Sequence, residues 1–240
     1  MKNFTKVLET LMLMTAILFT VGCKKDNGEE SGGGNGTYNG HDYVDLGLPS
    51  GLLWATCNIG ATMPEGYGDY FAWGETQPKD YYDWNTYQYA NGTSWEDPQL
   101  TKYCNNSSYG YNGFTDNLTT LLPEDDAATA NWGEGWRMPT EEEWRELFTN
   151  TNVTWTTQNG INGFLFSASD GNSLFMPAAG YRYDSNLGSA GSSGSGLSSS
   201  LYTDYPGGAW YFYFHSDGYG MDRYHRYYGR SVRPVRSGQN

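Results

Sequence analysis

Short apolar runs, each broken by glycine, asparagine or aspartate, make up most of this chain after residue 37. Residues 43–46, 52–55 and 70–73 have the length and aromatic content of β-strands. No long-period repeat divides this part of the chain, and about 200 residues suit a single core. The pattern predicts one domain over residues 38–240, built from short antiparallel strands and long loops.

Two segments carry helical signals. The stronger begins at Thr140, which can cap a helix while Glu143 reaches back as its capping-box partner. The apolar residues that follow share one helical face: Trp144, Leu147 and Phe148. The second helix is short, with Pro123 at its start and acidic residues at 124–126 facing the positive end of the dipole. Two helices among many strands predict an α+β fold.

Composition and charge exclude several classes of protein. The chain has 14 Lys and Arg against 27 Asp and Glu, a net charge of −13, whereas a nucleic-acid-binding protein needs a basic patch. Aromatic residues reach 17%, with 21 tyrosines, which is too many for a disordered chain. Three cysteines are too few for a disulfide scaffold or a four-cysteine zinc site. We expect a folded domain without metal or cofactor.

The N-terminus has the pattern of an export signal. Lys2 and Lys6 precede an apolar run, residues 11–21, that is too short to span a bilayer. Gly22 followed by Cys23 resembles a bacterial lipobox, which implies that residues 1–22 are a lipoprotein signal peptide. Cleavage would leave Cys23 as a lipidated N-terminus. The alternative is an ordinary signal peptide with an incidental cysteine.

Residues 24–37, KKDNGEESGGGNGT, are polar and glycine-rich, as in a flexible tether. Asp26, Glu29 and Glu30 follow Cys23 closely and resemble the surface-export signal of Bacteroidetes lipoproteins. The resemblance implies a domain held on the outer membrane by lipid at Cys23 and by a tether over residues 23–37. We expect it at the cell surface, and the membrane leaflet stays open.

Several motifs in order carry a resemblance over about residues 38–236. They are DLGLPSGLLWA at 45–55, DDAA at 125–128, NWG at 131–133, GWRMPT at 135–140, PAAGYR at 177–182 and SVRPV at 231–235. Together they resemble the Fibrobacter succinogenes major paralogous domain of Bacteroidetes lipoproteins. That family is similar to the formylglycine-generating-enzyme branch of the C-type lectin fold. The resemblance therefore implies a C-type lectin-like fold.

The C-terminal forty residues carry the strongest functional signal. Residues 209–215 alternate as a strand, with Trp210, Phe212 and Phe214 on a core face. The other face is tyrosine-rich, and tyrosine gives rigid contact area with a polar tip, as in antibody paratopes. We expect these residues to contact a ligand: Tyr202, Tyr205, Tyr211, Tyr213, His215, Tyr219, Asp222, Tyr224, His225, Tyr227, Tyr228 and Arg230.

The glycine- and serine-rich residues 188–196 predict a flexible loop beside this surface, so the expected ligand-binding region spans 188–230. If the face is a binding surface, replacing Tyr211 and Tyr213 with alanine abolishes binding and leaves the melting temperature nearly unchanged. The alternative is a tyrosine-rich strand face that the loop covers.

This end also resembles the variable region of proteins diversified by a retroelement. Such proteins use the C-type lectin fold to display a variable C-terminal surface. Their mechanism randomises adenines, and changing the adenines of an AAC codon gives Tyr, His, Asp, Ser and Gly, the residues crowded here. The resemblance implies a fixed inner face and a diversified outer one. The ligand would be a protein or glycan on another cell, a phage or the host.

Enzymatic and metal-dependent functions are less favoured. Formylglycine-generating enzymes need a late pair of copper-binding cysteines, whereas this domain has only Cys57 and Cys104. These two either pair in an oxidising compartment or stay separate buried thiols. The calcium signatures of lectins are absent, so glycan binding without calcium stays open. We expect no enzyme and no catalytic residues. A fixed-sequence structural or adhesin-type lipoprotein is the main alternative to a diversified binder.

Overall fold

The computed structural model describes residues 34–92 and 98–238. The expected signal peptide, the lipidation site at Cys23 and most of the tether lie outside these residues. The first strand already begins at Gly36, two residues before the expected start of the domain. No helix in the described part of the chain is long and apolar enough to cross a membrane.

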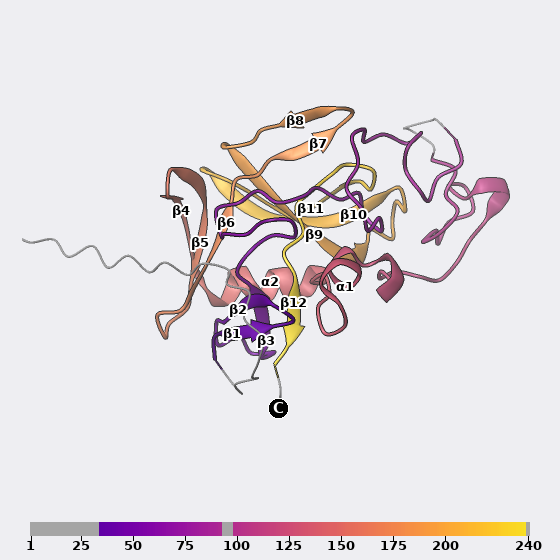
Figure 1. The fold of residues 1–240 in the computed structure, drawn as a ribbon. Coiled ribbons are helices and arrows are strands. Elements are labelled where there is room, and N and C mark those ends of the chain that lie inside the picture. Colours follow the sequence, from indigo (N-terminus) through magenta and orange to yellow (C-terminus); the bar gives the residue numbers. More distant parts are fainter. Residues whose placement is uncertain (1–33, 93–97, 239–240) are drawn as a thin grey trace, which may run out of the picture.

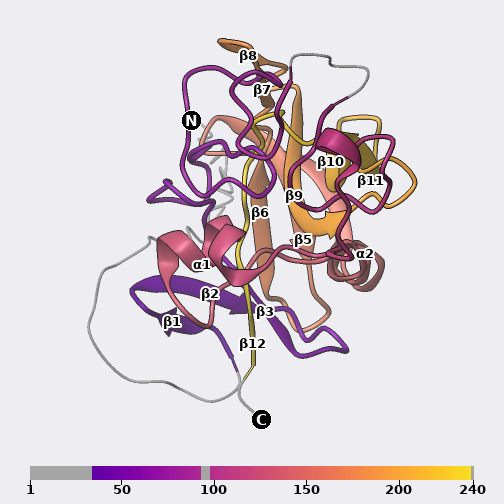
Figure 2. The same ribbon diagram turned by 90° about the vertical axis from the view of Figure 1, so that its right-hand side faces the viewer.

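Antiparallel sheets dominate the structure, as the α+β prediction required. One sheet has the order β1-β2-β3-β12 and lies at the lower end of the molecule in Figures 1 and 2. Its strands are β1 (Gly36–Tyr38), β2 (His41–Asp45), β3 (Leu52–Ala55) and β12 (Val235–Ser237). The C-terminal strand therefore pairs with one of the first strands of the domain.

Three further sheets are formed by the second half of the chain. One contains β4 (Asn152–Gln158), β5 (Ile161–Ser167) and β6 (Ser173–Pro177). The small hairpin of β7 (Tyr181–Tyr183) and β8 (Asn186–Gly188) lies at the opposite end from β12 (Figure 1). The C-terminal sheet has the order β11-β10-β9 and consists of β9 (Ser193–Leu201), β10 (Gly208–His215) and β11 (Gly218–His225).

Both predicted helices are present. Helix α2 (Glu141–Asn150) has the complete capping box: Thr140 accepts from the Glu143 backbone, and the Glu143 side chain accepts from Thr140 N–H. The second helical segment divides into the 3₁₀-helix η2 (Pro123–Asp125) and helix α1 (Ala127–Trp132). Asp126 caps α1 by accepting from two backbone N–H groups. Another 3₁₀-helix, η1 (Tyr111–Gly113), precedes them.

The C-terminal sheet is covered on both faces, which places two hydrophobic clusters against it. On one face, Phe212 and Phe214 of β10 pack with Trp144 and Leu147 of α2. The other face packs against the long connection between β3 and α1, in its described residues 56–92 and 98–126. Its buried aromatic residues include Trp73, Trp84, Tyr87 and Tyr103. The Trp73 indole N–H donates to the Ser198 carbonyl of β9 at 2.9 Å. Residues 70–73, expected to be a strand, form only one bridge there, between Phe71 and Arg230.

The sequence predicts a flexible loop over the glycine- and serine-rich residues 188–196. In the structure, residues 193–196 are instead the start of β9. A Cβ atom added at Gly194 would lie 2.1 Å from the Phe214 ring, and one at Gly196 would lie 2.4 Å from the Trp144 ring. These distances are far inside van der Waals contact, so aromatic rings lie directly on the strand. Glycine is needed here for close packing, and its conformational freedom is not used.

Candidate functional site

The tyrosine-bearing face of β10, on which ligand contact is expected, lies beside a hollow. Tyr211 of β10 pairs with Asp222 of β11, and Tyr213 pairs with Gly220 on one side and Ser195 on the other. Directly paired residues of an antiparallel sheet point to the same face. Tyr213 therefore has small neighbours on both flanking strands, which leaves open space beside its ring.

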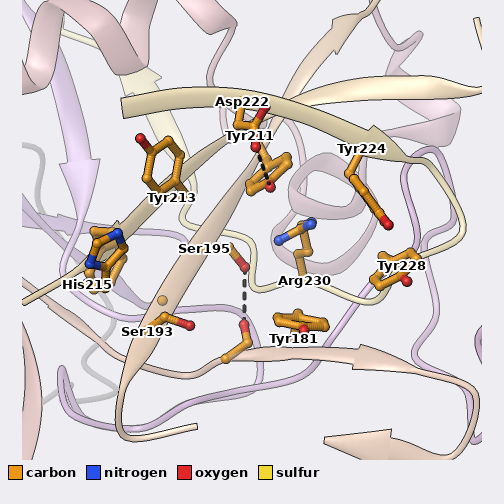
Figure 3. A pocket seen from close by; sticks show the side chains of 13 residues that line it. Tyr181, Ser193, Ser195, Tyr211, Tyr213, His215, Asp222, Tyr224, Tyr228 and Arg230 are labelled. Atoms are coloured by element: carbon orange, nitrogen blue, oxygen red, sulfur yellow. Dashed lines mark hydrogen bonds between the residues drawn. The ribbon is translucent and has the colours of Figure 1, made fainter. Parts of the chain in front are cut away.

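A pocket of about 390 Å³ lies over this face (Figure 3). Its volume falls within the range of about 300–1,000 Å³ typical of small-ligand sites. The segment after β11 and the turn before β7 complete its walls. The lining residues are Gly180, Tyr181, Ser193, Gly194, Ser195, Tyr211, Tyr213, Phe214, His215, Asp222, Tyr224, Tyr228 and Arg230. The pocket thus brings together seven of the twelve expected contact residues.

Arg230 is the cation of the pocket. Its backbone forms a two-way bridge with Phe71 (2.9 and 3.0 Å), which fixes the segment that follows β11. Its guanidinium carbon lies 3.4 Å from the centre of the Tyr211 ring, 5.6 Å from that of Tyr181 and 5.9 Å from that of Tyr228. The residue is only 6% exposed. Burial lowers the pKa of this guanidinium, and the nearby Tyr211 hydroxyl acts in the opposite direction.

Asp222 supplies the negative charge. Its carboxylate accepts a hydrogen bond from the Tyr211 hydroxyl at 3.2 Å and lies 3.7 Å from the Arg223 guanidinium. Burial raises the pKa of Tyr211, with Arg230 opposing that shift and Asp222 adding to it. The pocket therefore presents a cation and an anion, Arg230 and Asp222, both beside the Tyr211 side chain.

Tyr211 is not the exposed contact residue that the strand pattern predicts. Its side chain is 8% exposed and belongs to the cluster formed with the 56–126 connection. Tyr213 is half-buried, and Tyr224 is 46% exposed at the rim. Trp210, expected in the core, is partly exposed and lies under the Arg145 guanidinium at 5.9 Å. This burial argues against the expectation that alanine at Tyr211 would spare stability, because a segment from early in the chain covers that side chain.

Five expected contact residues do not line the pocket. Tyr219 packs on the opposite face of the sheet, against Phe148 and Phe164 at 5.7 and 5.4 Å between ring centres. Tyr202 lies 5.4 Å from Trp210 on that face as well. The remaining three are in an aromatic group with Trp84 and Tyr109: Tyr205, His225 and Tyr227.

Sequence reasoning missed the opposite wall of the pocket. Tyr181 precedes the β10–β11 region by about thirty residues and stands out in the sequence only as part of the PAAGYR motif. Ser193 and Ser195 have the surroundings of a loop. A signal was present in the alternating Tyr181-Arg182-Tyr183, which predicts a strand that exposes tyrosine on one face.

Two polar side chains of the pocket are hydrogen-bonded to the backbone. The Ser195 hydroxyl donates to the Gly180 carbonyl at 3.1 Å, and His215 Nδ1 accepts from the Asp217 N–H at 3.2 Å. Within residues 34–92 and 98–238, no group of three or more His, Cys, Asp or Glu residues could hold a metal ion. The arrangement is suited to holding a ligand by stacking, hydrogen bonds and charge.

Cys104 is a free, buried thiol, so the expected disulfide between Cys57 and Cys104 is absent. Cys57 is itself disulfide-bonded, so the alternative of two separate thiols does not hold either. The Cys104 sulfur lies 3.1 Å from the Asn106 carbonyl, and burial raises its pKa. The thiol therefore packs as a small apolar group.

No family model matches this chain, and no curated protein or solved structure matches it either.

Proposed function

We propose that this chain is a lipid-anchored binding protein of the bacterial outer membrane, with a C-type lectin-like fold, whose C-terminal pocket recognises a ligand outside the cell. The observation that carries the proposal is the pocket itself. Tyrosines from three separate parts of the chain, Tyr181, Tyr213 and Tyr224 among them, converge there on one buried arginine. Tyrosine and arginine, together with tryptophan, are enriched at binding hot spots.

The test compares two exposed tyrosines in a binding screen. The full-length protein, displayed on cells, is screened against glycan and protein panels, and any hit is measured again with single variants. Tyr224→Ala removes a ring that is 46% exposed at the pocket rim, whereas Tyr111→Ala removes one that is 41% exposed on η1. We expect the first to weaken binding at least tenfold and the second to leave it unchanged. Equal binding by both variants would contradict the proposal.

Retroelement diversification is part of this proposal and has its own test. The DNA flanking the gene is sequenced for a near-copy of the last hundred or so bases and for a reverse-transcriptase gene. We expect mismatches at template adenines in codons for accessible pocket residues such as Tyr213, His215 and Tyr224. Tyr211 and Arg230 are buried against each other, so their codons should be fixed. Absence of such a copy would leave a binding protein of fixed sequence.

One observation favours the fixed-sequence alternative. His225, Tyr227 and Tyr228 pack ring against ring, with centres 4.9–6.4 Å apart, so substitutions there would disturb several neighbours at once. A structural or adhesin-subunit role predicts self-association of the full-length protein, measured by light scattering in detergent. A single monomeric species would count against it.

A further inference from the structure

Arg230 is a buried cation whose charge no carboxylate neutralises directly. No acidic group within residues 34–92 and 98–238 forms an ion pair with it, and its side chain is surrounded by the rings of Tyr211, Tyr181 and Tyr228. Asp222 acts on Arg230 only at longer range, from beyond the Tyr211 hydroxyl. A buried charge without a direct ion-pair partner is costly, and an anion that enters the site offsets that cost. Because water screens little there, an anion next to Arg230 interacts strongly.

The guanidinium is directed into the pocket. Figure 3 shows it near the middle of the lining residues, between Tyr211 on one side and Tyr181 on the other, with Ser195 across the open space. The guanidinium has five N–H donors, and its interaction with Tyr211 engages only part of them, so donors remain for a ligand. The planar fork of arginine matches carboxylates and phosphates alike. Asp222 in the same pocket repels a doubly charged phosphate more strongly than a singly charged carboxylate, which favours the carboxylate.

The rest of the pocket is suited to hydroxyl groups. Asp222 can accept from ligand hydroxyls, and Ser193, Tyr213 and Tyr224 carry hydroxyls that both donate and accept. The tyrosine rings provide faces on which a sugar ring can stack. The Asp222 carboxylate would repel a carboxylate of the ligand. We therefore expect the ligand carboxylate to bind next to Arg230.

The position of the pocket argues against an extended peptide. Peptides that add to a sheet pair with a free strand edge, whereas this pocket lies over the face of β9, β10 and β11. A volume of about 390 Å³ suits a compact group such as one sugar unit with its substituents.

We propose that the pocket binds a carboxylate-bearing sugar residue, with the carboxylate on Arg230 and the ring hydroxyls toward Asp222 and the serines of β9. This inference rests on the proposed binding function and narrows it to acidic glycans.

The test uses isothermal titration calorimetry on the full-length protein in detergent micelles at pH 7. The probes are N-acetylneuraminic acid, glucuronic acid, the methyl ester of each, glucose and N-acetylglutamate. We expect one of the two acidic sugars to bind with one-to-one stoichiometry. Since a hydrogen bond to a charged group is worth roughly 10- to 100-fold in affinity, glucose and the ester should bind at least tenfold more weakly than the acid.

Two variants assign the effect to the pocket. Arg230→Gln should lower the affinity for the acidic sugar at least tenfold and leave the affinity for glucose unchanged. Arg145→Gln is the matched control, because it removes the same charge from α2, where the side chain pairs with Glu141 at 2.6 Å. It should leave acid binding unchanged. If Arg230→Gln fails to fold, the comparison of the bound acidic sugar with its own methyl ester on the unaltered protein still decides the question.

Each remaining outcome overturns the inference. Equal affinity for the acid and its ester would show that Arg230 does not bind the carboxylate. If N-acetylglutamate binds as tightly as the acidic sugars, the pocket recognises carboxylates of amino acids and not a sugar. No saturable binding of either acidic sugar would also refute it. The proposed binding function is tested separately, by comparing how Tyr224→Ala and Tyr111→Ala bind the ligands found in the screen. That comparison does not depend on the chemical class of the ligand.

Discussion

Replacing Tyr211 with alanine should lower stability strongly, although the residue stands on a strand face that the sequence alone assigns to a ligand. Its ring is 8% exposed and lies 3.4 Å from the Arg230 guanidinium carbon. Removing a buried aromatic side chain costs about 3–5 kcal/mol. For a domain of this size each kcal/mol corresponds to about 2–4 °C, so the melting temperature should fall by about 6–20 °C.

The assay is thermal unfolding followed by circular dichroism at pH 7, with two controls. Tyr211→Phe keeps the ring and loses the hydrogen bond to Asp222, so it should cost only about 1 kcal/mol. Tyr213→Ala removes the next tyrosine on the same face, which is half-buried at the pocket, and should cost about 1 kcal/mol as well. A drop in Tyr211→Ala no larger than in Tyr213→Ala would refute the reasoning, because the 56–126 connection would then not cover that face.

Three further predictions concern stability alone. Gly194→Ala should destabilise by about 1–3 kcal/mol, because its Cβ would meet the Phe214 ring; denaturant unfolding measures this, and an unchanged midpoint would contradict it. Thr140→Ala should cost about 1 kcal/mol by removing the capping box, whereas a serine there should restore the loss. Burial lowers the pKa of His41 and His225, so the unfolded chain binds more protons below about pH 6.5. The free energy of unfolding should therefore decrease as the pH falls from 7 to below 6.5. Replacing both histidines with phenylalanine should make it less dependent on pH in this range, and an unaltered pH dependence in that variant would refute the prediction.

Local signals predicted the elements that local interactions form. The capping box and the apolar face of α2 are set within ten residues, and both are present as expected. The alternation of residues 209–215 likewise predicted β10 and the burial of Phe212 and Phe214. The α+β class follows from the same short-range patterns.

A glycine-rich segment is predicted to be a loop, but here its glycines are required for close packing and not for flexibility. Residues 193–196 carry the composition of a loop, yet the rings of Phe214 and Trp144 lie against Gly194 and Gly196. Those rings belong to other elements, so nothing near residue 194 indicates that they are there.

The sequence by itself determined the chemistry of the candidate site: tyrosines, one histidine, Asp222 and an arginine gathered in the last forty residues. Only the tertiary structure decided which of them meet and which are buried. Tyr181 reaches the pocket from about thirty residues away, and residues 56–126 cover the face that holds Tyr211. The physical reason is that strand periodicity fixes which side chains share a face, whereas the burial of that face depends on what packs against it. Here that is a segment more than eighty residues earlier in the chain.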